Sequence, residues 1–144
     1  MSDFEAILQA YERSGGDPHF LRSPRVASLV ISGNRVLGSN EVAGVHLLSE
    51  ELPDGVRARV VVEPGVRLEA PAHLCFGVIP KEGVQRILSE FEIGDGARAE
   101  FIAHCTFPNA QRVVHLMEAT VHVGRGQSWN TARRITTASM AGWR

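Results

Sequence analysis

The chain has 144 residues, of which 44% are hydrophobic and 22% are charged, and its formal net charge is -1 at pH 7. These values are typical of a single globular domain, and we expect residues 1–144 to form one. Acidic and basic residues are spread along the chain, which argues against nucleic acid or an anionic membrane surface as the partner. No apolar run approaches the length of a membrane span, so none is predicted.

The first residues predict a short helix. Ser2 and Glu5 have the spacing of a capping box. An apolar stripe with helical spacing follows, made of Phe4, Ile7, Leu8 and Tyr11. The "SGGDP" stretch ends the helix, because glycine favours a helix end and proline cannot continue one. We therefore expect a helix and turn over 1–16 and a β-rich core over about 26–140.

The N-terminus also bears on the location of the protein. It lacks the basic start and apolar core of a signal peptide. Two cysteines without a secretory context predict a reducing, cytoplasmic setting.

Three later stretches share one plan of strand, short link, glycine and strand. They are "VVVEPGVRLEA", "FEIGDGARAEF" and "VHVGRGQSWNT", with turn glycines at Gly65, Gly96 and Gly126. The spacing of 31 and then 30 residues predicts that equivalent positions stack in columns, for example Val62, Ile93 and Val123. A strand with one apolar face that recurs at a fixed period favours an all-β fold of the β-helix or β-solenoid type. A β-sandwich or jelly roll is the competing prediction.

The same register brings histidine and cysteine side chains together. His73 and His104 would lie on adjacent coils, about 4.8 Å apart along the stacking direction. Cys105 lies beside them, and Cys75 is two residues beyond His73. Such a patch would bind zinc, copper or iron, or an imidazole would lower a thiol pKa. The alternative is that both thiols pack as small apolar side chains.

His115 is the remaining metal candidate. It occupies the position that matches Gln85 one period earlier, so the two should be neighbours. A hydrogen-bonded histidine at a strand edge is the alternative to a ligand. The candidate metal ligands are therefore His73, Cys75, His104, Cys105 and His115.

The order of three segments resembles the SufB/SufD family of iron–sulfur cluster assembly scaffolds. Pro64, Gly65, Val66 and Pro71 match one strand entry, and "GDGARAEFIAHCTFP" matches a segment that ends in Cys-Thr-x-Pro. His115 and the strand through Val123 match the third, so the resemblance spans about 55–135. This chain departs from the family pattern at His104 and Phe107, where glycine and alanine are usual.

The resemblance implies a right-handed parallel β-helix of few coils in a cytosolic, non-catalytic scaffold. It implies partners, namely an ABC-type ATPase and a cysteine desulfurase with its sulfur carrier. It also implies that Cys105 accepts sulfur, and that iron or an iron–sulfur cluster binds transiently. Family members continue through further coils into a C-terminal helical region, so a short relative is expected to lack that part.

Three classes of function follow. The leading hypothesis is a small SufB/SufD-like protein that assists iron–sulfur cluster assembly as a scaffold or sulfur-handling component. The alternative is a non-catalytic interaction module, a homodimer or a pair with a related β-helix protein, joined through open strand edges. An enzyme is the third, and it has the least support, because the sequence has no phosphate loop, nucleophile elbow or convincing pair of catalytic carboxylates.

Overall fold

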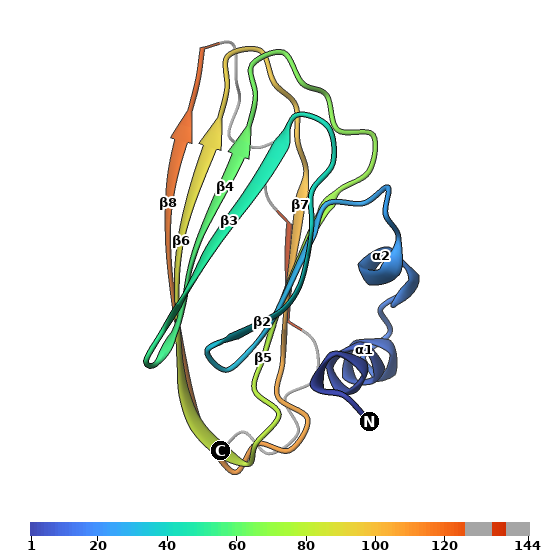
Figure 1. Ribbon diagram of the computed structural model, residues 1–144, viewed down its shortest axis with the longest axis vertical. Helices are drawn as coiled ribbons and strands as arrows, with labels where there is room; N and C mark the ends of the chain where they lie inside the picture. The colour runs from blue at the N-terminus through green and yellow to red at the C-terminus, as the bar shows by residue number, and fades with distance from the viewer. Residues whose placement is uncertain (126–133, 138–144) are drawn as a thin grey trace.

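The computed structural model describes residues 1–125 and 134–137. Two β-sheets face each other as layers, and helices cover the outer face of one of them (Figure 1). The five-strand sheet has the order β2-β1-β5-β7-β9, and the four-strand sheet has the order β3-β4-β6-β8. The strands are β1 (Ser28–Ser32), β2 (Arg35–Asn40), β3 (Val45–Leu52), β4 (Gly55–Val62), β5 (Ala72–Gly77), β6 (Glu82–Ile93), β7 (Phe101–Thr106), β8 (Arg112–Val123) and β9 (Arg134–Thr137).

The N-terminal helix forms where the sequence predicts it. Helix α1 spans Asp3–Arg13, and a short α2 spans His19–Arg22. Ser2 Oγ accepts the backbone N–H of Glu5 at 3.2 Å, as an N-cap should. The Glu5 carboxylate does not complete the capping box, because it forms an ion pair with Arg22 of α2. Three members of the predicted apolar stripe are buried: Ile7, Leu8 and Tyr11. Among the described residues, no helix has the length and apolar character needed to cross a membrane.

The predicted register is present in the four-strand sheet. Val62 pairs with Ile93, and Ile93 pairs with Val123, all in parallel. Gly65 and Gly96 adopt positive φ angles of 76° and 70°, which glycine accepts without strain. The Gly65 N–H donates to the carbonyl of Asp95, so the two turns lie side by side. The third predicted turn glycine, Gly126, lies outside the described residues.

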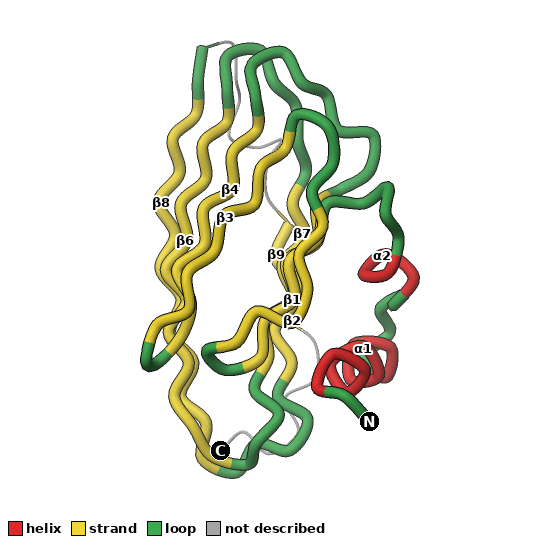
Figure 2. The backbone as a smooth tube through the Cα atoms, viewed as in Figure 1, coloured by secondary structure: helices red, strands yellow, loops and turns green. Residues whose placement is uncertain are grey.

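The prediction of an all-β right-handed parallel β-helix was wrong. Both sheets are mixed, because β1–β2 and β3–β4 are antiparallel whereas the other pairs are parallel. Within the described residues, Figure 2 shows two separate layers with helices outside them and no closed or solenoid sheet. The physical reason lies in two tight reversals, at Gly33-Asn34 and Pro53-Asp54. Each joins adjacent antiparallel strands, so the chain up to 62 forms hairpins and not coils.

The main core lies between the two sheets. It is built from the inward-facing residues of both, with Phe91 of β6 and Phe101 of β7 in an edge-to-face contact at 5.2 Å. A second core lies between the helices and the outer face of the five-strand sheet. Its buried members are Ile7, Leu8, Tyr11, Leu21, Val30 and Cys75. The middle strands β1, β5 and β7 are therefore covered on both faces.

The contact between β4 and β6 provides a test of this packing. A Cβ atom at Gly55 would lie 1.7 Å from the backbone oxygen of Arg86, whereas one at Gly83 would meet only Val78 at 3.7 Å. We expect Gly55→Ala to lower the free energy of unfolding by about 2 kcal/mol or more, since the backbone must move apart. Gly83→Ala should change it little. Urea unfolding of both variants measures the difference, and equal stability of the two would contradict the β4–β6 register.

Candidate functional site

The histidines and cysteines that the sequence predicted to form one patch lie on two opposite faces of the five-strand sheet. In the parallel pairing of β5 and β7, Cys75 pairs with His104 and Phe76 pairs with Cys105. Successive side chains of a strand point to opposite faces. Cys75 and His104 therefore face the helices, together with His73, and Cys105 faces the interior between the sheets. The five candidate ligands form two groups, not one.

The first group, here called the outer cluster, consists of His73, Cys75 and His104. His73 Nδ1 lies 3.3 Å from His104 Nε2, so one ring donates a hydrogen bond to the other. The sequence predicted that His73 and His104 would be opposite each other, but His73 is opposite Ile102, two residues earlier in β7. The two imidazoles still meet along a diagonal of the sheet. The ring of Tyr11 lies 4.2 Å from that of His104, and Phe20 stacks on His73 at 5.0 Å. The outer cluster thus joins both helices to the sheet.

Burial keeps the outer cluster uncharged. It lowers the pKa of His104 to about 4, with a smaller contribution from His73. It also lowers the pKa of His73. The pKa of the Cys75 thiol is raised to about 12, first by burial and then by the nearby Cys105. A thiol that stays protonated and imidazoles that stay neutral pack well but offer no reactive thiolate.

The second group, here called the inner cluster, consists of Cys105, His115 and Met117 with Gln85 behind them. Cys105 Sγ, from the five-strand sheet, lies 3.5 Å from His115 Nε2 and 3.8 Å from Met117 Sδ, both from β8 of the four-strand sheet. Cys105 is 8% exposed and Met117 is 41% exposed. The inner cluster therefore bridges the two layers and runs from the core towards solvent.

Gln85 sets the orientation of the His115 ring. Its side-chain nitrogen donates to the backbone carbonyls of Gly33 and Gly77, both at 2.9 Å. The remaining amide atom, Oε1, is an acceptor and lies 2.8 Å from His115 Nδ1. His115 must therefore carry its proton on Nδ1 when neutral. Its Nε2 lone pair then points at the sulfur of Cys105.

The electrostatics of the inner cluster match this assignment. Burial raises the pKa of the Cys105 thiol to about 11. Burial also lowers the pKa of His115, so the resting pair is a neutral thiol beside a neutral imidazole. The Phe107 ring packs 5.1 Å from the His115 ring and limits access of water from that side. The arrangement can transfer the thiol proton to Nε2 when an electrophile reaches Sγ.

Neither group is a metal centre built from the usual protein ligands. The described residues contain no set of three or more His, Cys, Asp or Glu side chains placed to hold a metal ion. The chain has two cysteines, and they lie on opposite faces of neighbouring strands. One copy of this chain therefore cannot ligate a cluster through two thiolates at one site.

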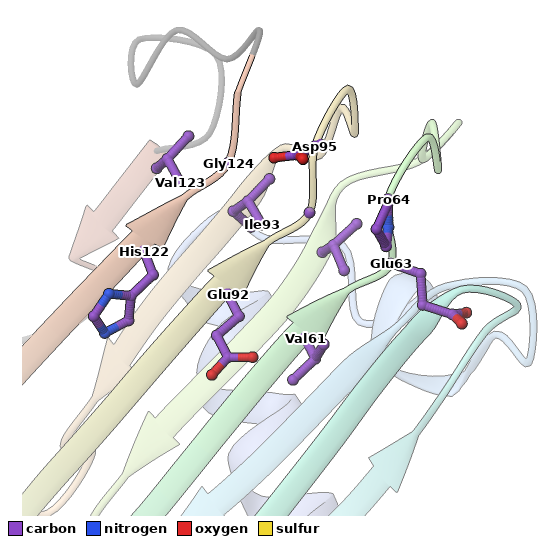
Figure 3. A pocket seen from close by; sticks show the side chains of 11 residues that line it. Val61, Glu63, Pro64, Glu92, Ile93, Asp95, His122, Val123 and Gly124 are labelled. Carbon is purple, nitrogen blue, oxygen red and sulfur yellow. The ribbon is translucent and has the colours of Figure 1, made fainter.

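An open pocket lies away from both groups, at the carboxyl ends of β4, β6 and β8 (Figure 3). Its volume is about 490 Å³, and its polar lining includes Glu63, Glu92, Asp95 and His122. Glu92 forms an ion pair with Arg59, and Asp95 Oδ1 accepts the backbone N–H of Arg125. These acids serve local structure, so we place the candidate site at the inner cluster and not in this pocket.

The sequence singles out Cys105 as a candidate. Its prediction that His115 and Gln85 are neighbours is confirmed, because the two residues are opposite each other in β8 and β6. Met117 and the role of the Gln85 amide were not predicted. The strand alternation of "VVHLMEA" already places His115 and Met117 on one face. Nothing in the sequence indicates that this face would meet Cys105 across the core.

The outer cluster predicts a loss of stability in mild acid. Because the pKa of His104 falls from 6.5 to about 4 on folding, the unfolded chain takes up a proton that the folded chain rejects. The free energy of unfolding should therefore fall as the pH drops from 6.5 to 4, by up to about 1.4 kcal/mol per pH unit for this residue. His104→Gln should flatten this slope in thermal unfolding across that range. An unchanged slope would show that His104 is protonated in the folded protein.

No family model matches the chain, and no solved structure matches it. The "Iron-sulfur cluster assembly SufBD family protein PH0883" of Pyrococcus horikoshii is 33% identical over 129 residues, which cover 90% of this chain. The SufBD family protein MJ0034 of Methanocaldococcus jannaschii is 20% identical over 86% of this chain. The chain spans 39% of the length of each of these two relatives.

Both similarities cover the strands that carry the inner cluster, since each extends over at least 86% of the chain. They agree with the resemblance carried by the three strand-and-glycine segments and by Cys105. The similarity to these two proteins over most of the chain supports its membership of the SufBD family of iron–sulfur cluster assembly proteins.

Proposed function

We propose that this chain assists iron–sulfur cluster assembly by accepting sulfur on Cys105, as a scaffold component that does not itself turn over a substrate. The observation that carries the proposal is the 3.5 Å approach of Cys105 Sγ to the Nε2 lone pair of His115. Family membership supports the involvement in cluster assembly, and the geometry of the inner cluster supports the choice of sulfur atom.

The chemistry is a transfer of sulfane sulfur between two thiols. His115 Nε2 takes the proton of Cys105, and the resulting thiolate attacks the outer sulfur of a persulfide on a donor protein. The new S–S bond forms as the donor's S–S bond breaks, and the donor leaves as a thiolate. His115 then returns its proton to that thiolate, so neither charge nor electrons are left over.

The surroundings of Cys105 support storage of the product. A persulfide is readily oxidised or reduced when it is exposed. Cys105 is 8% exposed and lies between two sheets, with Phe107 buried close by. The donor must reach the sulfur from the side of Met117, which is the exposed end of the inner cluster. We propose, from the family resemblance, that the donor is a cysteine desulfurase with its sulfur carrier and that an ABC-type ATPase is a further partner.

Persulfide trapping tests this assignment. After incubation with a small-molecule persulfide donor, mass spectrometry should find one added sulfur on Cys105 in the wild-type chain and in Cys75→Ala. Cys105→Ala should carry none. Cys75 is the control because it is the other buried thiol of the chain but faces the helices, away from His115. Equal labelling of Cys75 would remove the basis for the proposal.

The role of His115 has its own test. His115→Gln keeps a polar side chain but lacks a base, so transfer to Cys105 at pH 7 should slow by about 100-fold. The rate in this variant should rise with pH, because hydroxide then deprotonates the thiol, whose pKa is raised to about 11. Stopped-flow measurement of transfer at several pH values separates this from a packing defect, which would not be rescued by base.

A second candidate function is self-association through β8. In the described part of the chain, β8 has one partner strand, β6, and its other edge is open. Val114 and Leu116 on its outer face are 51% and 52% exposed. An open, 12-residue edge with apolar side chains is a ready site for pairing with a further strand. We propose a second copy of this chain as the occupant, with the two β8 edges antiparallel about a two-fold axis.

Sedimentation velocity tests the pairing. The wild-type chain should sediment as a dimer, and Val114→Lys should shift it towards monomer, since charge at an edge disfavours strand addition. Glu118→Lys adds a cation at the same strand without removing apolar area and serves as a partial control. A wild-type chain that remains monomeric at high concentration would rule out this second function and leave the sulfur proposal untouched.

A further inference from the structure

We propose that Cys105, His115 and Met117 form a binding site for a soft monovalent metal ion, Cu(I). The three side chains present a thiolate, an imidazole nitrogen and a thioether, and all three belong to the inner cluster. Thiolate and thioether ligands select Cu(I) over harder ions, and imidazole suits copper as well. This Cu(I) ion is distinct from the iron–sulfur cluster of the proposed function, because its site includes a methionine and needs only one cysteine.

The distances match those between ligands of one metal ion. Bond lengths of about 2.0 Å to nitrogen and about 2.3 Å to sulfur, taken from zinc sites, put N and S about 3.5 Å apart at a tetrahedral angle. The same bonds put two sulfur atoms about 3.8 Å apart. Cys105 Sγ lies 3.5 Å from His115 Nε2 and 3.8 Å from Met117 Sδ. Both separations from Cys105 Sγ therefore equal those expected for two ligands on one ion.

The hydrogen bond that His115 makes through its other ring nitrogen is the kind found at metal-bound histidines. Such histidines usually donate their other ring N–H to a protein acceptor, which fixes the tautomer and the ring plane. Here His115 Nδ1 lies 2.8 Å from Gln85 Oε1, and the Gln85 nitrogen is held by two backbone carbonyls. Gln85 is fully buried, so this arrangement persists whether or not an ion is bound.

Charge favours a monovalent ion over a divalent one. One thiolate and one Cu(I) form a neutral unit, which a mostly buried site tolerates, whereas Zn²⁺ or Fe²⁺ would leave an uncompensated positive charge. No carboxylate joins the cluster, and the described residues contain no set of three His, Cys, Asp or Glu side chains that could hold a metal ion. The donor set therefore fits Cu(I) and does not fit the harder ions.

Met117 gives the ion a route into the site. It is 41% exposed, whereas Cys105 is 8% exposed, so the thioether meets an incoming ion first. Binding then exchanges the Cys105 thiol proton for Cu(I), the Cu–S bond forms, and the proton is released to solvent. No oxidation state changes. If Cys105 also accepts sulfur, as proposed above, Cu(I) and sulfur exclude each other on the same atom; that consequence rests on the proposed function, whereas the binding itself does not.

The test uses Cu(I) alone, under anaerobic conditions, in competition with a chromophoric Cu(I) chelator. The protein is the full chain with Cys75→Ala, which removes the second thiol. We expect one equivalent of Cu(I) to bind, and Met117→Leu to weaken it about tenfold or more, since even loss of an outer-shell partner costs that much. X-ray absorption should show one nitrogen and two sulfur ligands, falling to one sulfur in Met117→Leu.

A matched variant keeps the methionine count constant. The double change Leu116→Met with Met117→Leu moves the thioether to the opposite face of β8, so it should bind Cu(I) no better than Met117→Leu. Both residues are exposed, so the double variant should fold, and circular dichroism checks this. Binding that is unaffected by Met117→Leu, or one sulfur ligand in the parent protein, would overturn the proposal. Persulfide labelling of the copper-free Cys75→Ala parent reports on Cys105 as a sulfur acceptor without any copper present, so failure of Cu(I) binding is distinguishable from failure of the sulfur function.

Discussion

The parallel pairing of β6 with β8, in which each residue lies opposite the one 30 positions later, is the constraint on which the site depends. It places His115 opposite Gln85. The amide of Gln85 is in turn held by carbonyls at Gly33 and Gly77, which belong to the other side of the core. Backbone register, one buried amide and one imidazole therefore form a continuous chain of contacts that ends at the sulfur of Cys105. A change of register by one residue would turn His115 out of the core.

Successive side chains of β7 point to opposite faces of the sheet, so the neighbours His104 and Cys105 have different roles. His104 points outward, packs under Tyr11 and stays neutral, so it serves to attach the helices. Cys105 points inward to His115 and Met117. The two positions at which this chain departs from the family pattern acquire a physical role here. His104 fills the space beneath α1, and Phe107 packs against the His115 ring.

Burial explains why the thiol is protected and why it needs an adjacent base or an incoming metal ion. Removing Cys105 from water raises its pKa to about 11, so at neutral pH the free thiol is almost fully protonated. Both proposed reactions replace that proton, one with sulfur and the other with Cu(I). His115 assists the first as a proton acceptor and the second as a ligand, and Gln85 prepares its Nε2 lone pair for either.

The amino-acid sequence by itself determined the local and periodic features: the N-terminal helix, the turns at Gly65 and Gly96, and the column of Val62, Ile93 and Val123. These follow from capping, from glycine conformation and from a spacing that repeats. Only the tertiary structure decided that the first strands form hairpins within two mixed layers, and that Cys105 meets Met117 rather than Cys75. Strand alternation tells which residues share a face, but which faces meet across a core depends on how the layers pack, and that is set by contacts far apart in the chain.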